Sequence, residues 1–400
     1  MNIVFWVNQF PVVSETFIRD QIIGLKNKGI NPLILVSYTS SDTLALKGFE
    51  NYNLLENITE KGDLLTKNKI KRVIKALLIL LKNINKSSFF YYLKSLNVIK
   101  LKKESLNLSL FYLLHYLLEN KIEVIHAHFG NNGEQAAIIK SLGVPIKLIT
   151  TFHGYDIRAG ISKGGIIYKN LKTHGDVIIA ISPYNKEKLI GFGFDSSQLV
   201  SINNGINTTN FKPSHIKSTS DSKIKIISVG RLVEIKGFDM ALYALKNVLE
   251  KFDNYQIEYT IIGEGHQYNI LNQIAIELNI SNQVVFKGAL SSEQISDQLK
   301  HSDFYLLSSR NEAIPTVVLE AQACALPVVA TNVGSVKDVV LEGVNGYLAE
   351  VNIESITEAL LKMIDNKNNW KTFGNNSREL IDNQYSYNSM LEKLIQLYKS

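Results

Sequence analysis

Residues 303–332 read DFYLLSSRNEAIPTVVLEAQACALPVVATN, which is two short apolar runs separated by a helical pattern. The outer runs, DFYLLSS and PVVATN, have the composition of buried strands. Proline resists a helix interior but suits its first turn, so Pro315 marks the start of a helix. A strand, a helix and a second strand in this order predict one unit of a parallel α/β sheet.

Two glutamates bracket this helix start. Glu312 lies in the loop before the helix, and Glu320 lies inside it, on the second turn. They are eight positions apart, so they are not the neighbours that an i,i+4 pair would be. Between them a bare helix N-terminus offers backbone N–H groups to an anion.

The same alternation of apolar strands and helical stretches runs twice along the chain. A polar, serine-rich stretch, KPSHIKSTSDSK at 212–223, separates the two halves. The sequence therefore predicts an α/β protein with two Rossmann-like domains, at 1–211 and 224–383. A final helix at 384–400 is expected to pack back on the first domain. Ligands of parallel sheets bind beyond the carboxyl ends of the strands, so a cleft between the two domains is the expected site.

Composition narrows the class of protein. The chain has 400 residues, of which 45% are hydrophobic and 20% charged, as in soluble globular proteins. Its single cysteine, Cys324, excludes an internal disulfide, and its apolar surroundings indicate an inert buried thiol. The N-terminal MNIVFWVNQFP lacks a basic region and reads as a first strand. The aliphatic run ALLILL at 76–81 is far too short to span a membrane, so a cytoplasmic protein is expected.

The positive charge is concentrated in one segment. Between Lys61 and Glu104 there are twelve Lys or Arg and two acidic residues, a local charge of +10. Because the net charge is +6, the remainder carries −4, which argues against a general nucleic-acid binder. Basic residues alternate with an aliphatic stripe in KIKRVIKALLILLKNINK. Two interpretations stay open: a helix lying on an anionic membrane surface, and a packed helix with a solvated lysine face.

Two cations follow the first strand of the second domain. The stretch VGRLVEIKG at 229–237 places Arg231 and Lys236 in the loop that leaves this strand. They could clamp a diphosphate, arginine bidentately and lysine as a point charge, or they could be ordinary surface charges.

A short glycine motif argues against a dinucleotide cofactor. IIGEGHQYN contains Gly263 and Gly265, but Tyr268 stands where a dinucleotide fingerprint has its third glycine. The two glycines are instead expected to permit a tight strand-to-helix turn near a nucleotide. No GxxxxGK[ST] pattern occurs, so ATP hydrolysis has no support.

Three histidines stand near the ends of first-domain strands. His126 and His128 share a strand face, but zinc needs a third convergent ligand, so no metal is predicted. No Asp-x-Asp occurs either, and a metal held by paired aspartates on a diphosphate is not indicated. His153, followed by Gly154, is placed to meet a substrate, whereas His126 is interpreted as structural.

The first helix start is a candidate for the acceptor side. In FPVVSETFI, Ser14 is a good N-cap and Glu15 complements the helix dipole, so capping alone explains both. These two residues, together with Thr16 and His128, are also candidates to contact a polar acceptor.

Four stretches, in order, resemble the donor domain of the family 4 glycosyltransferases. They are SVGRLVEIKG, IIGEG, VVFKGAL and SSRNEAIPTVVLEAQACALPVVATNVGSVKDVVLEGVNGYL. The resemblance covers the whole second domain and implies the two-domain GT-B fold. FPVVSETFI and HAHFG in the first domain are similar to members that build bacterial exopolysaccharide.

The resemblance implies a role for each candidate residue. Glu312 would contact the hydroxyls of the donor sugar, and Glu320 those of the ribose. Backbone amides around Pro315, Thr316, Val317 and Val318 would receive the diphosphate, whose charge Arg231 and Lys236 would neutralise. His153 would correspond to the active-site histidine, and retention of anomeric configuration without a metal is implied.

The sequence departs from the family pattern at a few positions. Ala313 and Ser335 replace usual glycines, and Ala313 could narrow the space at the sugar. The resemblance predicts a transferase that moves a sugar from a UDP- or GDP-sugar to a glycan acceptor, lipid-linked at the membrane. Two rivals remain: a nucleotide-sugar epimerase on the same scaffold, and a non-catalytic partner subunit of a transferase.

Overall fold

The structure is a computed structural model that describes residues 1–12, 15–40, 52–97, 105–214, 223–252, 256–312 and 315–400. It divides into two compact units. Unit 1 comprises Met1–Ile202 with Tyr398–Ser400, and unit 2 comprises Asn203–Leu397.

This division differs from the expected domain limits of 211 and 224. Residues 203–211 cluster with unit 2, and so does most of the final helix, of which only the last residues belong to unit 1. The reason is local pairing within unit 2: Ile206 forms an isolated parallel bridge with Ser386, and its amide donates to the Tyr385 carbonyl at 2.9 Å. The expected linker at 212–223 lies mostly outside the described residues.

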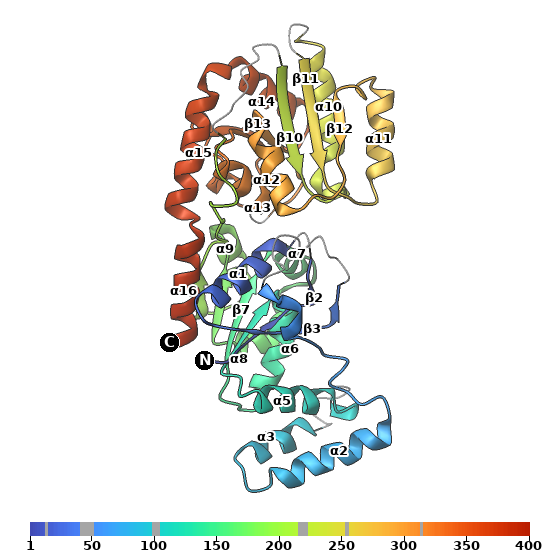
Figure 1. Ribbon diagram of the computed structural model, residues 1–400, viewed down its shortest axis with the longest axis vertical. Helices are drawn as coiled ribbons and strands as arrows, with labels where there is room; N and C mark the ends of the chain where they lie inside the picture. The colour runs from blue at the N-terminus through green and yellow to red at the C-terminus, as the bar shows by residue number, and fades with distance from the viewer. Residues whose placement is uncertain (13–14, 41–51, 98–104, 215–222, 253–255, 313–314) are drawn as a thin grey trace. The chain divides into compact units, whose positions relative to one another are not determined.

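Unit 1 is built on a seven-stranded sheet with the order β5-β3-β1-β6-β7-β8-β9, in which every neighbouring pair is parallel (Figure 1). The strands are β1 Ile3–Trp6, β3 Leu33–Val36, β5 Ile58–Glu60, β6 Val124–His128, β7 Lys147–Phe152, β8 Val177–Ala180 and β9 Leu199–Ser201. All of these strands except β5 coincide with apolar runs in the sequence, and the burial of their side chains explains those runs. A separate short pair joins β2 Gln9–Phe10 to β4 Tyr38–Thr39.

Helices connect these strands. They are α1 Thr16–Asn27, α2 Lys69–Lys82, α3 Ser88–Ser95, α5 Ser109–Glu119, α6 Gly130–Lys140, α7 Gly154–Lys163, α8 Lys169–His174 and α9 Pro183–Gly191. Within the part of the chain that the structure describes, no helix is both long enough and apolar enough to cross a membrane.

Unit 2 has a six-stranded parallel sheet with the order β12-β11-β10-β13-β14-β15. The strands are β10 Lys223–Val229, β11 Gln256–Ile262, β12 Val284–Phe286, β13 Phe304–Leu307, β14 Val328–Thr331 and β15 Gly346–Ala349, and the predicted runs DFYLLSS and PVVATN contain β13 and β14. The helices are α10 Phe238–Leu249, α11 Tyr268–Glu277, α12 Ser292–Lys300, α13 Thr316–Ala323, α14 Ile353–Asp365, α15 Trp370–Gln384 and α16 Tyr387–Lys399.

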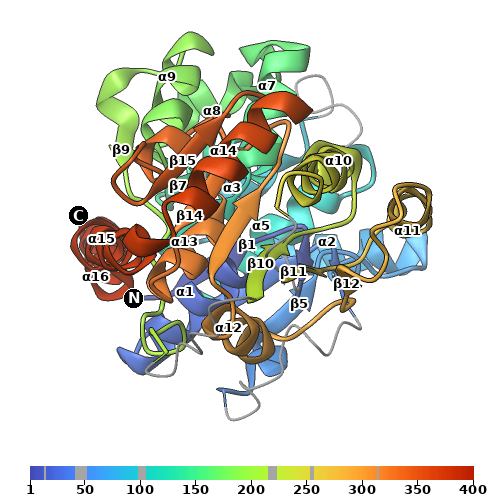
Figure 2. The same ribbon diagram turned by 90° about the horizontal axis from the view of Figure 1, so that it is seen from above.

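Helices cover both faces of this sheet. In Figure 2, α10, α11 and α14 lie on one side of the sheet and α12 and α13 lie on the other. The core is divided in the same way, because neighbouring residues of a strand point to opposite faces. Val329 packs in the cluster with α10 and α14, whereas Val328 and Ala330 pack in the cluster with α13. Cys324 is buried as predicted, and burial raises the pKa of its thiol to about 12.

Candidate active site

Three loops of unit 2 meet at one edge of its sheet. They follow the neighbouring strands β11, β10 and β13, whose carboxyl ends lie side by side because the strands are parallel. The loops comprise residues 230–237 after β10, 263–267 after β11 and 308–312 after β13. This edge is where open parallel sheets bind ligands, and it holds most of the predicted donor-site residues.

An ion pair joins two of these loops. The Lys236 ammonium nitrogen lies 2.5 Å from Glu312 Oε1, and the Ser309 hydroxyl donates to the same oxygen at 2.7 Å. Glu312 is only 8% exposed, so its charge needs this compensation. An ammonium group has three N–H donors, which leaves Lys236 able to donate to further oxygens.

Sequence reasoning missed the arginine that holds this pair in place. Arg310 forms two hydrogen bonds with the Asp239 carboxylate, at 2.8 and 2.6 Å, and donates to the Glu234 carbonyl at 2.7 Å. The Ser308 hydroxyl also donates to the Lys236 carbonyl at 3.1 Å. Burial alone would raise the pKa of Asp239, but the hydrogen bonds and charge of Arg310 outweigh burial and lower it. The loop after β13 is therefore fastened to the turn that carries Lys236. In the sequence, only the opposite charges of Arg310 and Asp239 could have indicated this contact.

Glycines allow the three loops to approach backbone to backbone. Gly237 has φ +62°, and a Cβ there would lie 2.0 Å from the Ser308 carbonyl oxygen. A Cβ on Gly263 would lie 1.9 Å from the Gly230 oxygen, and one on Gly265 would lie 2.2 Å from the Leu232 oxygen. The predicted tight turn between β11 and α11 is thus present, and it packs directly on the loop that carries Arg231.

Arg231 differs from Lys236. Its side chain is exposed, and its guanidinium group has no hydrogen-bond or ion-pair partner among the described residues. It follows β10 directly after Gly230, at the sheet edge where the loops meet. This guanidinium group can therefore bind an anion without first breaking an internal contact within the described part of the chain.

The predicted helix between the two glutamates is present, and it begins one residue later than predicted. Pro315 is the N-cap of α13, and Thr316 is the first helical residue. Glu312 precedes the helix, and Glu320, which is 8% exposed, lies in its second turn. The Val318 amide donates to the Pro315 carbonyl at 3.0 Å, whereas the Thr316 and Val317 amides have no acceptor among the described residues. Two of the predicted amides are thus available to an anion. Ala313 lies outside the described residues.

In unit 1, His126 has hydrogen-bonding partners on both ring nitrogens, as expected of a structural histidine. Its Nδ1 lies 2.7 Å from the Tyr398 hydroxyl, and its Nε2 lies 2.8 Å from the Thr151 hydroxyl. Burial lowers its pKa to about 3, so the ring is neutral. Both ring nitrogens are therefore occupied, and neither is left for a metal.

His128 and His153 form a stacked, buried pair. Their ring centroids are 5.4 Å apart, and His128 Nδ1 lies 3.2 Å from His153 Nε2. Burial lowers the pKa of both groups, that of His153 to about 3. In the described structure, His128 Nε2 and His153 Nδ1 are buried without hydrogen-bond partners. The structure thus brings a predicted catalytic residue and a predicted acceptor-side residue into direct contact.

Sequence reasoning also missed Asp156, which fixes the backbone of His153. Its carboxylate accepts from the amides of His153, at 2.8 Å, and Gly130, at 2.9 Å, and so joins the turns after β7 and β6. Burial raises its pKa to about 6 although these amides favour the charged form. The spacing from His153 matches a helix cap, which was a usable signal.

The start of α1 differs from the prediction. Glu15, not Ser14, occupies the N-cap position, and its side chain makes no capping hydrogen bond. The Glu15 amide donates to the Val12 carbonyl at 3.1 Å. Thr16 is the first helical residue, and Ser14 lies outside the described residues.

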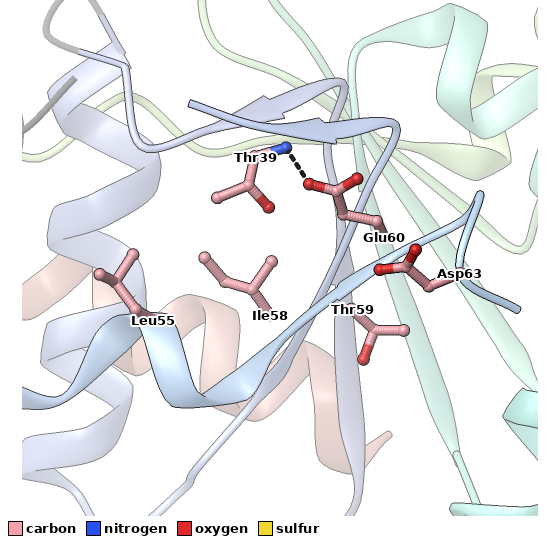
Figure 3. A pocket seen from close by; sticks show the side chains of 6 residues that line it. All are labelled: Thr39, Leu55, Ile58, Thr59, Glu60 and Asp63. Atoms are coloured by element: carbon pink, nitrogen blue, oxygen red, sulfur yellow. Dashed lines mark hydrogen bonds between the residues drawn. The ribbon is translucent and has the colours of Figure 1, made fainter. Parts of the chain in front are cut away.

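A separate open hollow of about 350 Å³ lies at the edge of the unit 1 sheet (Figure 3). Hydrogen bonds from the Thr39 side chain and from the Thr39 amide, which lies 2.7 Å from a Glu60 carboxylate oxygen, lower the pKa of Glu60. The lining residues are Thr39, Leu55, Ile58, Thr59, Glu60 and Asp63. None of them is a predicted site residue.

No group of three or more His, Cys, Asp or Glu suited to a metal ion is found among the described residues.

Comparison with known proteins places the chain in a family. Residues 211–380 match the family model described as glycosyl transferases group 1, and residues 85–210 match glycosyltransferase family 4. An uncharacterized glycosyltransferase of Methanocaldococcus jannaschii is 30% identical over 266 residues, which cover 64% of this chain and 70% of that protein. The chain belongs to the family 4 glycosyltransferases. The similarity predicted from the sequence is therefore confirmed.

Other relatives of this glycosyltransferase carry names from polysaccharide synthesis. The putative colanic acid biosynthesis glycosyltransferase WcaL of Escherichia coli is 27% identical over 362 residues, covering 88% of this chain and 87% of WcaL. Among solved structures, HepE of Anabaena in complex with UDP has a TM-score of 0.76 at 17% identity, and the match covers both chains completely. This likeness confirms the predicted GT-B fold.

Proposed function

We propose that this glycosyltransferase moves a sugar from a UDP- or GDP-sugar to a glycan acceptor in the synthesis of a surface polysaccharide. The acceptor is lipid-linked, the enzyme works at the inner face of the cell membrane, and the anomeric configuration is retained without a metal. WcaL supports the polysaccharide part by its name, and HepE, which was solved with UDP, supports a nucleotide-linked donor.

The observation that carries the proposal is the Lys236–Glu312 pair at the carboxyl edge of the unit 2 sheet. Lys236 keeps N–H donors for a diphosphate, and the exposed Arg231 guanidinium can bind it bidentately. The Thr316 and Val317 amides add the positive end of the α13 dipole. Together these groups stabilise the negative charge that develops on the leaving diphosphate. In their absence, a metal ion would have to stabilise this charge.

The remaining site residues bind the rest of the donor in this proposal. Glu312, held by Lys236 and Ser309, accepts from hydroxyls of the transferred sugar, and Glu320 accepts from the ribose hydroxyls. In this proposal His153 of unit 1 is the active-site histidine, and Asp156 fixes its backbone.

The first test is ligand-dependent thermal stability in the presence of a chelator. A nucleotide sugar at 100 times its dissociation constant stabilises the folded state by about 2.7 kcal/mol, so the correct donor raises the unfolding temperature. We expect a response to UDP- or GDP-sugars without added metal. If no nucleotide sugar raises the unfolding temperature, the proposed donor class is wrong.

A second measurement separates the rival functions. With a glycan acceptor present, NMR of the product reports whether the anomeric configuration of the donor is kept. An epimerase would interconvert free nucleotide sugars without any acceptor, and a non-catalytic subunit would turn over neither substrate.

A further inference from the structure

The main apolar face of α2 points away from the core of unit 1. Six large apolar side chains follow one another at helical spacings of three and four and share one face. They are 51–72% exposed: Ile70, Val73, Ile74, Leu77, Leu78 and Leu81. On this helix only Ala76 and Ile79 are buried. A surface helix normally buries such a stripe, and a contiguous exposed apolar patch indicates a partner.

Contacts on the opposite side fix α2 in this orientation. The Tyr112 hydroxyl of α5 donates to the Arg72 carbonyl at 2.5 Å, and the Arg72 guanidinium donates to the Asn107 carbonyl at 3.1 Å. The neighbouring helix α3 is attached to α5 through Tyr92, whose hydroxyl lies 2.9 Å from His115 Nδ1. In the view of Figure 1, α2 and α3 lie together at one end of unit 1, beyond α5. These contacts therefore hold the apolar face of α2 away from the core of unit 1.

Helix α3, the next helix along the chain, also exposes large apolar side chains. Its Phe90 is 66% exposed and its Leu93 is 44% exposed. We call the six apolar residues of α2 together with Phe90 and Leu93 the α2–α3 surface.

The charges around this surface identify its partner. Eight Lys or Arg and no acidic residue occur from Lys67 to Lys94. Lys71, Lys75 and Lys82 share one flank of α2, beside the apolar face. Lysine is depleted in the cores of protein interfaces, whereas long lysine side chains beside an apolar face suit an anionic lipid surface.

Not every basic residue of the segment is available for this contact. Lys61 lies over the Trp6 ring at 5.2 Å, Lys94 donates to the Leu142 carbonyl, and Arg72 is bonded to backbone carbonyls. Residues 98–104 lie outside the described part of the chain. The charges left to face a membrane include Lys71, Lys82 and Lys86, which are exposed.

We propose that the α2–α3 surface docks unit 1 on an anionic lipid bilayer. The apolar side chains enter the boundary between headgroups and acyl chains, to a depth of about 5–10 Å, and the lysine ammonium groups stay among the lipid phosphates. The idea that this docking brings the enzyme to a lipid-linked acceptor rests on the proposed function, but the docking itself does not.

The test is co-sedimentation of the full chain with phosphatidylcholine vesicles that contain or lack phosphatidylglycerol. We expect binding only to the anionic vesicles, and weaker binding as salt rises. The variants Ile74→Ser/Leu77→Ser/Leu81→Ser and Lys71→Gln/Lys82→Gln/Lys86→Gln should each bind at least about tenfold more weakly. The matched control is Ile270→Ser/Ile276→Ser on α11, whose side chains are similarly exposed, at 55% and 51%, and it should bind normally.

Two outcomes would overturn the proposal. One is wild-type protein that stays in the supernatant with anionic vesicles at low salt. The other is a wild-type dimer in analytical ultracentrifugation that the serine variant converts to monomer while vesicle binding is absent, because a second copy would then cover the surface. Donor-induced stabilisation, measured on the same variants, is expected to be unchanged. Its absence in the wild type would refute the proposed function and leave the vesicle result standing.

Discussion

The two glutamates that bracket the start of α13 lie in different positions and therefore have different expected roles. Glu312 is tied to Lys236 and Ser309 in the loop before the helix, close to the cations proposed for the diphosphate. Glu320 lies inside the helix, beyond the amides proposed for the same group.

We predict that Glu312→Gln lowers kcat by about 100-fold or more while nucleotide affinity stays near normal, since the lost contact is made to the transferred sugar. Glu320→Gln should weaken binding of free nucleotide diphosphate and of the intact donor about 10-fold, because a charged hydrogen-bond acceptor is lost. Calorimetry with both ligands separates the two effects. Equal losses for both variants and both ligands would contradict the division of roles, and Glu379→Gln, an exposed glutamate of α15, serves as the control.

Arg231 allows a test of diphosphate binding without a stability effect. Its side chain is exposed and has no partner among the described residues, so Arg231→Ala should leave the unfolding midpoint unchanged. We expect kcat/KM to fall about 100-fold or more. Arg231→Lys should recover little of it, because the bidentate fork is lost.

The comparison for this prediction is Arg310→Lys. Arg310 acts through the positions of Asp239 and Glu234, so its replacement should lower the unfolding midpoint. Near-normal turnover of Arg231→Ala would show that this arginine is only a surface charge.

At the scale of the element, the site depends on loops that touch through their backbones. Gly237 joins the Lys236 turn to α10 in a left-handed conformation and lies directly against Ser308. Gly343 has a similar φ of +70° but nothing within 4 Å of a Cβ. The two glycines therefore differ in crowding and not in backbone strain.

We predict that Gly343→Ala lowers the free energy of unfolding by about 1 kcal/mol, the cost of the backbone conformation alone. Gly237→Ala should cost about 1–3 kcal/mol more, because the Cβ displaces the loop that carries Glu312. It should also weaken donor binding, whereas Gly343→Ala should not. Urea unfolding and donor titration of both variants check this, and equal costs would mean that the loops separate easily.

Most of the strands, the start of α13 and the positions of the two glutamates around it could be predicted, because each follows from a local sequence pattern. The buried strands appear as apolar runs, and Pro315 marks α13 within one residue. Arg310 could not be assigned a role, because its partners are on α10 and on the loop after β10, which only the sheet topology brings near. Asp156 was overlooked although its spacing from His153 matches a helix cap, and only its contact with Gly130 depends on the fold. The orientation of α2 was undecided for the same reason: an amphipathic pattern shows that a face exists but not which side the core occupies.

At the scale of the whole molecule, unit 1 encloses three neutral histidines. His126, His128 and His153 each have a pKa lowered by burial, whereas the pKa of Asp156 is raised. A histidine with a depressed folded-state pKa contributes stability that is present above pH 6.5 and lost as the pH falls below it. Asp156 acts oppositely between about pH 6 and 3.8, because its folded form holds the proton more tightly.

We therefore predict that acid destabilises this protein well before carboxylates in general are protonated. Near pH 5 these four groups take up about two protons net on unfolding, which lowers the free energy of unfolding by about 3 kcal/mol per pH unit. Urea unfolding at pH 7, 6 and 5 measures the slope. His126→Gln should reduce this slope by about one proton. Constant stability from pH 7 to 5 would refute the buried neutral cluster.

The hydroxyl that satisfies His126 belongs to Tyr398, almost two hundred positions beyond the rest of unit 1. The chain thus leaves unit 1 after Ile202 and returns to it only with its final residues. A single recombination event near residue 202 would give a hybrid enzyme whose histidine cluster comes from one parent and whose tyrosine comes from the other. Swapping the second half between relatives, which would change the donor under the proposed function, should therefore succeed best with a second crossover that restores the matching C-terminal residues.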